Sequence, residues 1–424
     1  MSESPADTEW FTHDRFGMFI HWGAYALAAR HEWVRAYERL TDEEYQHYVD
    51  HFDPDLFDPV QWADEAWNAG MRYVVVTTKH HDGFCLWDSA EGDYTVASTP
   101  WGNDLIGPIV EAFRARGMKI GLYYSLLDWH HPEFPLDLYH PEGKDEAAVA
   151  AATDRDMTKY TEYLHAQVRE LLTRYGKIDL MWFDFSYEGR GFGAKGPKEW
   201  QSERLVEMAR ELQPEILINN RLGLGSGDFT TPEQVQPPGH QLDGEAAAPW
   251  EACQTLNGSW GYHRDNLDWK SSELMLRMLV DGVSKGGNMI LNVGPNGRGD
   301  FEPRAVERLR EIGAWMRLNE RSVRGCGPSE YVPPVDARYT QNGNRLYLHL
   351  FSWPMRFVHL PGLGGRIQYA QLLHDASEVR QMVIDPHEPA HIYLRGLPAD
   401  TATLQLPVTP PDITNPVIEI FLAD

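Results

Sequence analysis

Five short apolar segments recur along the middle of the chain, at residues 73–78, 119–124, 178–184, 215–220 and 287–293. The first reads Tyr-Val-Val-Val-Thr-Thr, and an unbroken run of apolar and β-branched residues is typical of a strand that is buried on both faces. The pattern between these segments is helical, and several helical stretches end at a glycine, for example Gly70, Gly117 and Gly176. Helices between successive buried strands predict a parallel sheet.

The number of predicted strands favours a closed barrel over an open sheet. A further strand at residues 16–22 and another near Trp250 bring the total close to eight, so we expect an α/β fold of the (β/α)8-type barrel kind. No Gly-x-Gly-x-x-Gly turn follows the first strand, which weakens a dinucleotide-binding fold. The helices are predicted at residues 59–69, 105–116, 154–175, 203–212, 271–285 and 303–318.

The sequence pattern changes after about residue 330. Helical periodicity gives way to short alternating runs, such as residues 345–351 and 390–394, which are separated by turns rich in proline and glycine. This pattern predicts a small C-terminal antiparallel β-sandwich. We therefore predict two domains, a catalytic barrel over residues 1–329 and a β-sandwich domain over residues 330–424.

Composition and charge exclude several classes of partner. The 424 residues have a formal net charge of −25, which repels nucleic acid and anionic membrane surfaces. No apolar run approaches the ~20 residues of a membrane-spanning helix. The first residues lack the basic and apolar regions of a signal peptide, so we expect a cytoplasmic protein, or a secreted one whose leader has been trimmed. Cys85, Cys253 and Cys326 are far apart, which predicts reduced thiols rather than disulfides or a zinc ribbon.

Polar and aromatic side chains gather where the predicted strands end. Asp184 ends the apolar run at residues 178–184, where a carboxylate is costly unless it is paired, hydrogen-bonded or used in chemistry. The carboxyl ends of barrel strands meet at one mouth, where active sites are built. The titratable and hydrogen-bonding residues that we expect at this mouth include His21, His80, His81, Tyr123, Asp184, Arg221 and Glu251.

Some of these residues have simpler interpretations. The pair His80-His81 could bind a metal ion, but adjacent strand residues point to opposite faces, and the chain has no His-x-His or His-Glu-x-x-His motif. We therefore favour hydrogen-bonding histidines and predict neither a metal nor a cofactor. Arg221 could form a purely structural ion pair with Asp184 or Glu251.

Two carboxylates among neutral hydrogen-bonding groups and aromatic rings are the groups that glycoside hydrolysis requires. One carboxylate attacks the anomeric carbon, and the other must carry a proton. A wall of low polarity raises the pKa of the proton carrier, while hydrogen bonds or a cation keep the first carboxylate ionised. Asp184 and Glu251 are the pair that the predicted strand ends supply.

Several motifs occur in a fixed order along the chain. The most specific are His-His-Asp-Gly-Phe at residues 80–84 and Trp-Phe-Asp at residues 182–184. The others are residues 16–23, Glu32-Trp33, residues 121–125 and 219–221, Trp250-Glu251, and residues 259–262, 284–288 and 291–295. From about residue 10 to 330 this set resembles the family 29 glycoside hydrolases, which are retaining α-L-fucosidases. The β-rich tail resembles the C-terminal domain of that family.

The resemblance implies catalysis by double displacement. Asp184 matches the nucleophile of the family and would form a covalent fucosyl-enzyme. Glu251 matches the general acid/base of one branch of the family, and Glu245 and then Glu188 are the next candidates. The last two lie in long loops rich in glycine, which we predict at residues 222–249 and 188–198.

The resemblance also implies a sugar pocket. His21, His80, His81 and Tyr123 match residues that bind the fucose hydroxyls, and Glu32, Trp33 and Arg221 match other residues of the pocket. Trp260 and Trp269 are both candidates for packing against the fucose methyl group. The implied substrates are fucosylated glycans or aryl fucosides.

Three alternatives stay open. The chain could be a glycosidase for a related sugar such as an α-L-galactoside, a non-catalytic fucose-binding protein, or a metal-dependent hydrolase. The presence of both Asp184 and Glu251 argues against a binding protein, because binding alone does not need two carboxylates. The sequence leaves open whether the chain forms a homo-oligomer, and whether the C-terminal domain covers a barrel flank or lends a loop to the pocket.

Overall fold

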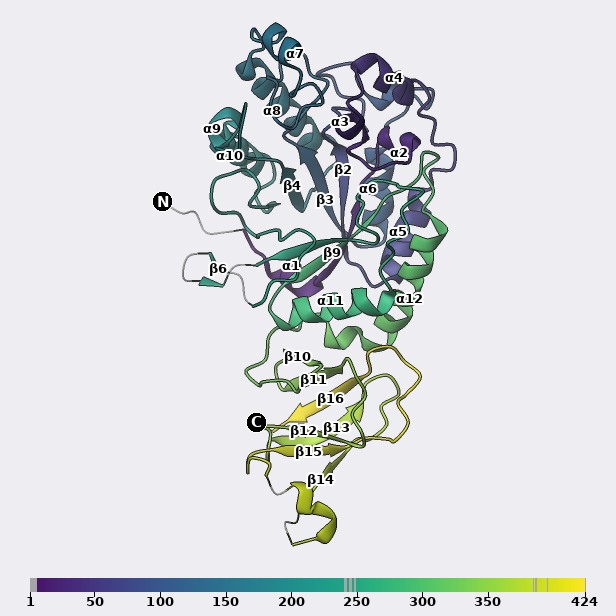
Figure 1. Ribbon diagram of the computed structural model, residues 1–424, viewed down its shortest axis with the longest axis vertical. Helices are drawn as coiled ribbons and strands as arrows, with labels where there is room; N and C mark the ends of the chain where they lie inside the picture. Colours follow the sequence, from purple (N-terminus) through teal and green to yellow (C-terminus); the bar gives the residue numbers. More distant parts are fainter. Residues whose placement is uncertain are drawn as a thin grey trace.

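The computed structural model describes residues 6–239, 242–243, 246–247, 249–383, 385, 387–394 and 396–423. The N-terminal part contains a curled sheet of seven parallel strands among helices, and the C-terminal part contains antiparallel sheets that lie below it in Figure 1. The parallel strands follow the order β5-β4-β3-β2-β1-β9-β8. Their bounds are β1 (Phe16–Ile20), β2 (Tyr73–Lys79), β3 (Lys119–Ser125), β4 (Leu180–Asp184), β5 (Leu217–Ile218), β8 (Glu251–Thr255) and β9 (Asn288–Val293).

A short segment at residues 229–233 closes the sheet into a barrel. On one side, Phe229 pairs in parallel with Asn219, directly after β5. On the other side, Glu233 pairs in parallel with Cys253 of β8. The predicted (β/α)8-type barrel is therefore confirmed, with residues 229–233 in the place of the eighth strand. We predicted a loop over residues 222–249. The segment at residues 229–233 pairs only through isolated bridges and has no regular strand pattern, so a strand could not be predicted there. A two-stranded ribbon follows it, with β6 (Leu242–Asp243) and β7 (Ala246–Ala247).

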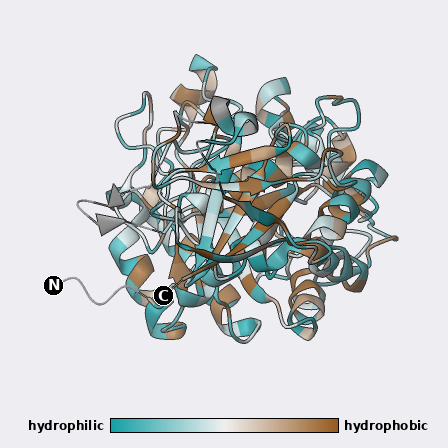
Figure 2. Cartoon of the chain, turned by 90° about the horizontal axis from the view of Figure 1, so that it is seen from below, coloured by the Kyte–Doolittle hydropathy of each residue, from teal (hydrophilic) through white to brown (hydrophobic). Residues whose placement is uncertain are grey.

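The predicted helices are present. Side-chain caps explain several of their starts: Asp58 accepts hydrogen bonds from the backbone N–H groups of Val60 and Gln61, and Ser271 accepts one from Leu274. Hydrophobic residues concentrate in the central strands when the molecule is seen from below, whereas the surrounding helices mix hydrophobic and hydrophilic residues (Figure 2). None of the described helices is long and apolar enough to cross a membrane. The long helices are α5 (Pro59–Asn68), α6 (Ile106–Ala115), α8 (Met157–Arg174), α10 (Ser202–Leu212), α11 (Ser272–Ser284) and α12 (Pro303–Asn319).

Shorter helices decorate the connections. They are α1 (Glu9–Asp14), α2 (Tyr25–Ala28), α3 (Val34–Glu38), α4 (Asp42–Asp50), α7 (Glu146–Ala151), α9 (Pro197–Trp200), η1 (Val96–Ser98) and η2 (Glu320–Ser322). The first of them, α1, places Phe11 against the barrel interior, with its ring 4.8 Å from that of Phe229. This contact closes the end of the barrel where the strands begin.

Apolar side chains fill the barrel below its mouth. Phe19 of β1 and Trp182 of β4 belong to this interior cluster, and their ring centroids lie 5.1 Å apart. Cys253 of β8 belongs to it as well and, like Cys85 and Cys326, is a buried free thiol. Because the lower barrel is filled, the carboxyl ends of the strands are the part of the interior that a ligand can reach.

The C-terminal part contains two facing antiparallel sheets, as predicted. One has the strand order β10-β11-β16-β13 and the other β12-β15-β14. Alternating apolar residues of both sheets, such as Leu348 and Leu404, share one buried cluster. The strands are β10 (Ala337–Asn342), β11 (Arg345–Leu350), β12 (Phe357–Leu360), β13 (Ile367–Leu372), β14 (Arg380–Met382), β15 (Ala402–Gln405) and β16 (Val417–Leu422).

The prediction of a strand at residues 390–394 is wrong. Residues 390–394 belong to a 3-10 helix, η3 (Pro389–Leu394), because the alternating pattern there is short and begins at a proline that cannot donate to a strand ladder. The predicted domain boundary at residue 330 falls between Ser322, which ends η2, and Ala337, which begins β10. No element lies between these two residues in the described chain.

The C-terminal sheets pack against the flank of the barrel formed by α11 and α12. Arg338 of β10 donates a hydrogen bond to Asp281 of α11 at 2.7 Å, and Arg277 of α11 donates to the carbonyl of Phe351 at 2.6 Å. Figure 1 shows the two helices between the barrel and the sheets. This arrangement answers one open question, since the domain covers a barrel flank.

Candidate active site

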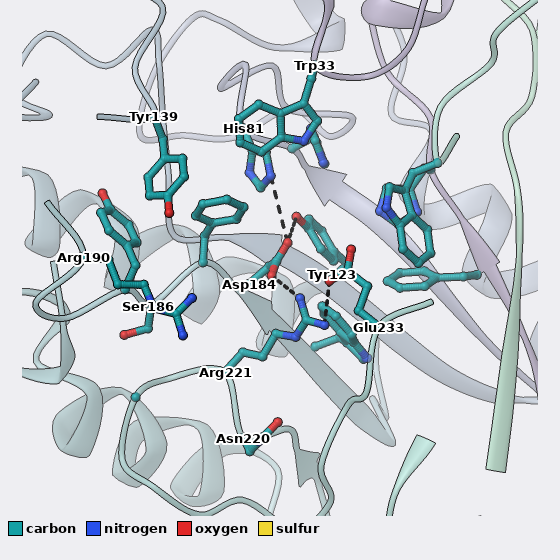
Figure 3. A pocket seen from close by; sticks show the side chains of 18 residues that line it. Trp33, His81, Tyr123, Tyr139, Asp184, Ser186, Arg190, Asn220, Arg221 and Glu233 are labelled. Atoms are coloured by element: carbon teal, nitrogen blue, oxygen red, sulfur yellow. Dashed lines mark hydrogen bonds and ion pairs between the residues drawn. The ribbon is translucent and has the colours of Figure 1, made fainter. Parts of the chain in front are cut away.

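A pocket of about 590 Å³ opens at the carboxyl ends of the barrel strands (Figure 3). Seven of the predicted site residues line it: His21, Trp33, His80, His81, Tyr123, Asp184 and Arg221. None of its lining residues comes from the C-terminal sheets. The remaining lining residues are Phe19, Tyr139, Trp182, Phe185, Ser186, Tyr187, Arg190, Asn220, Gly223, Glu233 and Trp260.

Asp184 ends β4 and projects into this pocket, where its side chain is 13% exposed. The Tyr123 hydroxyl donates to its Oδ2 at 2.9 Å, Arg221 Nη1 donates to its Oδ1 at 2.8 Å, and His81 Nε2 lies 4.0 Å from Oδ2. Burial alone would raise the pKa of this carboxyl, but the charge of Arg221 and the hydrogen bonds outweigh burial and lower it. Asp184 is therefore held as an ionised carboxylate that a ligand can approach.

Arg221 connects Asp184 to a second carboxylate, that of Glu233. Its Nη2 lies 2.9 Å from Glu233 Oε2, while its Nε donates to the Thr231 hydroxyl at 2.8 Å. The guanidinium also stacks over the Trp182 ring at 4.5 Å, which fixes its plane. One arginine thus holds two pocket carboxylates.

Glu233 is a pocket residue that was not predicted from the sequence. It lies at the end of the barrel-closing segment, and its side chain is 43% exposed toward the pocket. No motif or strand pattern marks this position. The only sequence signal was that the loop predicted at residues 222–249 is long enough to carry functional groups.

Three histidines line the pocket as neutral groups. His21 Nδ1 lies 2.7 Å from Asn292 Oδ1 and His81 Nδ1 lies 2.6 Å from Ser125 Oγ, whereas His80 Nδ1 has no hydrogen-bond partner among the described residues. Burial lowers the pKa of His21 to about 3, that of His81 to about 4, and that of His80 well below its ordinary value. A neutral imidazole offers one donor and one acceptor, which suits sugar hydroxyls. The described residues contain no cluster of His, Cys, Asp and Glu side chains that could hold a metal ion.

The structure corrects the prediction for Glu251. We expected it at a strand end, but it is the first residue of β8 and therefore lies near the floor of the barrel. Its side chain is 0% exposed, the Tyr73 hydroxyl donates to Oε1 at 2.6 Å, and Trp182 Nε1 donates to Oε2 at 3.2 Å. Burial raises its pKa to about 7. Glu251 does not line the pocket, so it is not placed to protonate a leaving group beside Asp184.

The two other candidates for the acid/base differ in what the structure says of them. Glu188 is exposed and does not line the pocket, and Glu245 lies outside the described residues. Glu32 also stands behind the pocket rather than in its lining. It is buried, accepts a hydrogen bond from the Gly261 N–H at 2.8 Å, and so holds the loop that carries Trp260. Burial raises the pKa of the Glu32 carboxyl to about 7.

The structure also distinguishes Trp260 from Trp269, the two candidates for packing against the fucose methyl group. Trp260 lines the pocket, with its ring 5.1 Å from that of His21. Trp269 lies elsewhere, beneath the guanidinium of Arg304 at 4.6 Å. Trp33 lines the pocket and packs edge-on against His81 at 5.0 Å.

Phe185, directly after Asp184, is a second residue that the sequence analysis missed. Its φ of +78° lies in the left-handed region, which a bulky residue adopts only when its surroundings enforce it. Its ring packs against His81 at 4.8 Å and Trp33 at 5.4 Å. The strained backbone thereby turns an aromatic ring into the pocket beside the carboxylate.

Comparison with known proteins identifies the family. A family model described as Alpha-L-fucosidase matches residues 2–321, which is most of the chain. The chain belongs to the α-L-fucosidase family. The predicted resemblance to family 29 glycoside hydrolases is therefore confirmed, and so is the predicted enzyme class, a glycoside hydrolase of the α-L-fucosidase type.

Relatives within the α-L-fucosidase family cover between 81% and 100% of this chain. Isoenzyme 1 from Paenibacillus thiaminolyticus has a TM-score of 0.91 and 46% identity, covering 98% of this chain and 99% of that one. A Bacteroides thetaiotaomicron α-L-fucosidase, solved as a trapped covalent intermediate with 2-fluoro-fucosyl fluoride, has a TM-score of 0.85 and 27% identity, covering 100% and 98%. Human tissue α-L-fucosidase is 30% identical over 379 residues, which is 81% of this chain and 76% of the human protein.

Proposed function

We propose that the chain is a retaining exo-α-L-fucosidase in which Asp184 is the nucleophile and Glu233 is the general acid/base. One observation carries this proposal: Arg221 holds Asp184 on Nη1 at 2.8 Å and Glu233 on Nη2 at 2.9 Å. Two carboxylates on one guanidinium lie close together. Retaining glycosidases need their pair ~5–5.5 Å apart, whereas inverting enzymes leave ~6.5–9.5 Å for a water molecule.

The first step forms a covalent intermediate. A carboxylate oxygen of Asp184 attacks the anomeric carbon of the sugar, and the bond between that carbon and the leaving oxygen breaks. Glu233 transfers its proton to the leaving oxygen, so the alcohol departs neutral. The ionised Glu233 that results is stabilised by Arg221.

The second step reverses these roles. Glu233 takes a proton from a water molecule, and the oxygen of that water attacks the anomeric carbon from the face that the leaving group vacated. The ester bond to Asp184 breaks, which restores the carboxylate. Two inversions give net retention. The covalent intermediate trapped in the Bacteroides relative supports this route.

The pocket suits a single terminal sugar. Phe19 and Trp182 close its floor, so a chain of sugars cannot pass through. His21, His80 and His81 offer neutral hydrogen-bonding groups for the sugar hydroxyls. The aromatic face of Trp260 is our choice for the contact with the C6 methyl group.

A substrate panel tests this function. We expect the wild-type enzyme to hydrolyse 4-nitrophenyl α-L-fucoside with a kcat/KM roughly 10- to 200-fold above that for 4-nitrophenyl α-L-galactoside, because the two sugars differ only at C6. Asp184→Ala should abolish turnover of both substrates while circular dichroism shows an intact fold. Equal or faster galactoside hydrolysis would instead favour the related-sugar alternative. Calorimetric binding of fucose without any hydrolysis would favour a binding protein.

A further inference from the structure

Arg190 is the second arginine of the pocket and has no acidic partner among the described residues. Its backbone N–H bonds to the Tyr187 carbonyl at 3.2 Å, but no ion pair or hydrogen bond of its guanidinium occurs in the described part of the chain. Arg221, by contrast, is fully engaged with Asp184 and Glu233. Figure 3 shows Arg190 beside Ser186, on the opposite side of Asp184 from Glu233. The Arg190 guanidinium is therefore unpaired within the described residues, although the two arginines of the pocket formally balance Asp184 and Glu233.

The loop that carries Arg190 is clamped at its neck. The Tyr187 N–H donates to the Lys195 carbonyl at 2.8 Å, which closes the loop over residues 187–195. Below this bond, Lys195 Nζ donates to Asp137 Oδ2 at 2.7 Å, and the Tyr187 hydroxyl donates to the same oxygen. Asp137 is completely buried, so the clamp is protected from water and salt. Arg190 thus projects from an anchored loop rather than from a free one.

Three aromatic rings form a wall beneath this loop. The rings of Tyr139 and Phe185 lie 4.8 Å apart, and those of Tyr139 and Tyr187 also lie 4.8 Å apart. The Ser186 hydroxyl oxygen is buried near Gly223 and has no hydrogen-bond partner in the described residues. Aromatic faces of this kind bind sugar or aryl rings, and an unsatisfied hydroxyl can bond to a ligand.

We propose that this wall and Arg190 bind the leaving group, and that the site selects leaving groups that carry an anionic oxyacid substituent, a carboxylate or a sulfate. The inference rests on the proposed function and deepens it. A guanidinium presents a planar fork that matches such oxyanions, and no protein carboxylate among the described residues occupies it. The net charge of −25 repels anions in general, so a local arginine is needed to admit them.

Two matched aryl fucosides test the proposal. We would measure kcat/KM for 4-(carboxymethyl)phenyl and 4-(carbamoylmethyl)phenyl α-L-fucosides, which differ in charge at a position insulated from the leaving oxygen by a methylene group. Taking the ratio of the two kcat/KM values removes any effect of a substitution that is the same for both substrates. Arg190→Gln should lower this ratio roughly 5- to 10-fold, as expected for the loss of a partly exposed charge-assisted contact. Most of the change should appear in KM.

The controls separate the possible outcomes. Arg169→Gln removes the same charge from an exposed position on α8, away from the pocket, and should leave the ratio unchanged. A 4-(sulfomethyl)phenyl fucoside, whose sulfonate stands in for a sulfate, shows which oxyanion is preferred, and dependence on Arg190 with either anion supports the proposal. Ratios that Arg190→Gln leaves within about 2-fold for both anions would overturn it. If wild type does not hydrolyse even the neutral fucoside, the proposed function fails first, and this inference with it.

Discussion

At the scale of single residues, Arg221 governs how charge is shared in the pocket. It contacts Asp184 through one terminal nitrogen and Glu233 through the other, so the same guanidinium charge interacts with both carboxylates. In the proposed mechanism, Asp184 loses its charge when the ester forms, and Glu233 becomes ionised in the same step. The arginine therefore keeps one anionic partner throughout the reaction.

Removal of Glu233 gives the first prediction. Glu233→Ala should lower kcat/KM on an alkyl fucoside by roughly 10²–10⁴-fold, because the leaving oxygen loses its proton donor. An activated aryl fucoside should still form the covalent intermediate, and added azide should then displace Asp184 from the anomeric carbon. Azide needs no general base and arrives on the vacated face, so the product should be α-L-fucosyl azide by NMR.

Glu251 provides the matched control for this experiment. Glu251→Gln should gain no rate from azide, because this residue lies near the floor of the barrel and does not line the pocket. Azide rescue of Glu251→Gln together with full activity of Glu233→Ala would reverse our assignment of the acid/base.

Glu251 also gives a prediction about stability. Its pKa is raised from 4.5 to about 7 in the folded chain, so the unfolded chain releases this proton first as pH rises. At this residue the folded state then binds more protons than the unfolded state, so the contribution of Glu251 to the free energy of unfolding falls between pH 4.5 and 7. Glu251→Gln removes this contribution. The variant should therefore gain up to about 3 kcal/mol relative to wild type between pH 5 and pH 8. Urea unfolding at both pH values measures this, and a constant difference would contradict it.

At the scale of elements, the residues that could be predicted are those that follow regular strands. The apolar run at residues 178–184 ends at Asp184, and similar runs place His21 and Tyr123, because a strand stops where its apolar pattern stops. Glu233 could not be found this way, since its segment pairs only through isolated bridges. Glu251 was misplaced because we expected its strand to end there, whereas β8 begins at Glu251 and runs to Thr255.

The closing segment gives the element-scale prediction. A Cβ at Gly227 would lie 2.7 Å from the backbone of Asn219 and Asn220, so Gly227→Ala should push the closing segment away from β5. We expect a loss of about 1–3 kcal/mol of stability and a lower kcat/KM, because Arg221 and Glu233 lie on either side of the shifted contact. Gly92→Ala is the control, since its Cβ would meet no atom within 4 Å. Equal melting temperatures and activities for both variants would contradict this account.

At the scale of the whole molecule, the candidate active site and the C-terminal sheets lie in different parts of the structure. The C-terminal sheets rest on α11 and α12, and the pocket is built entirely from the barrel and its loops. The mouth is lined by side chains from strand ends far apart in sequence, so the site exists only when the barrel is closed. Phe19 and Trp182 close the floor of the pocket, and in the proposed function this fits removal of a terminal sugar rather than cleavage within a chain.

The central claim is that Asp184 and Glu233 act as a retaining pair. The most direct test is proton NMR of the fucose released from an aryl α-L-fucoside during the first minutes, before the anomers equilibrate. We predict that α-L-fucose appears first and that β-L-fucose grows in only by mutarotation. Initial release of β-L-fucose would mean a single displacement by water, with the carboxylates ~6.5–9.5 Å apart. That result would contradict a covalent bond to Asp184.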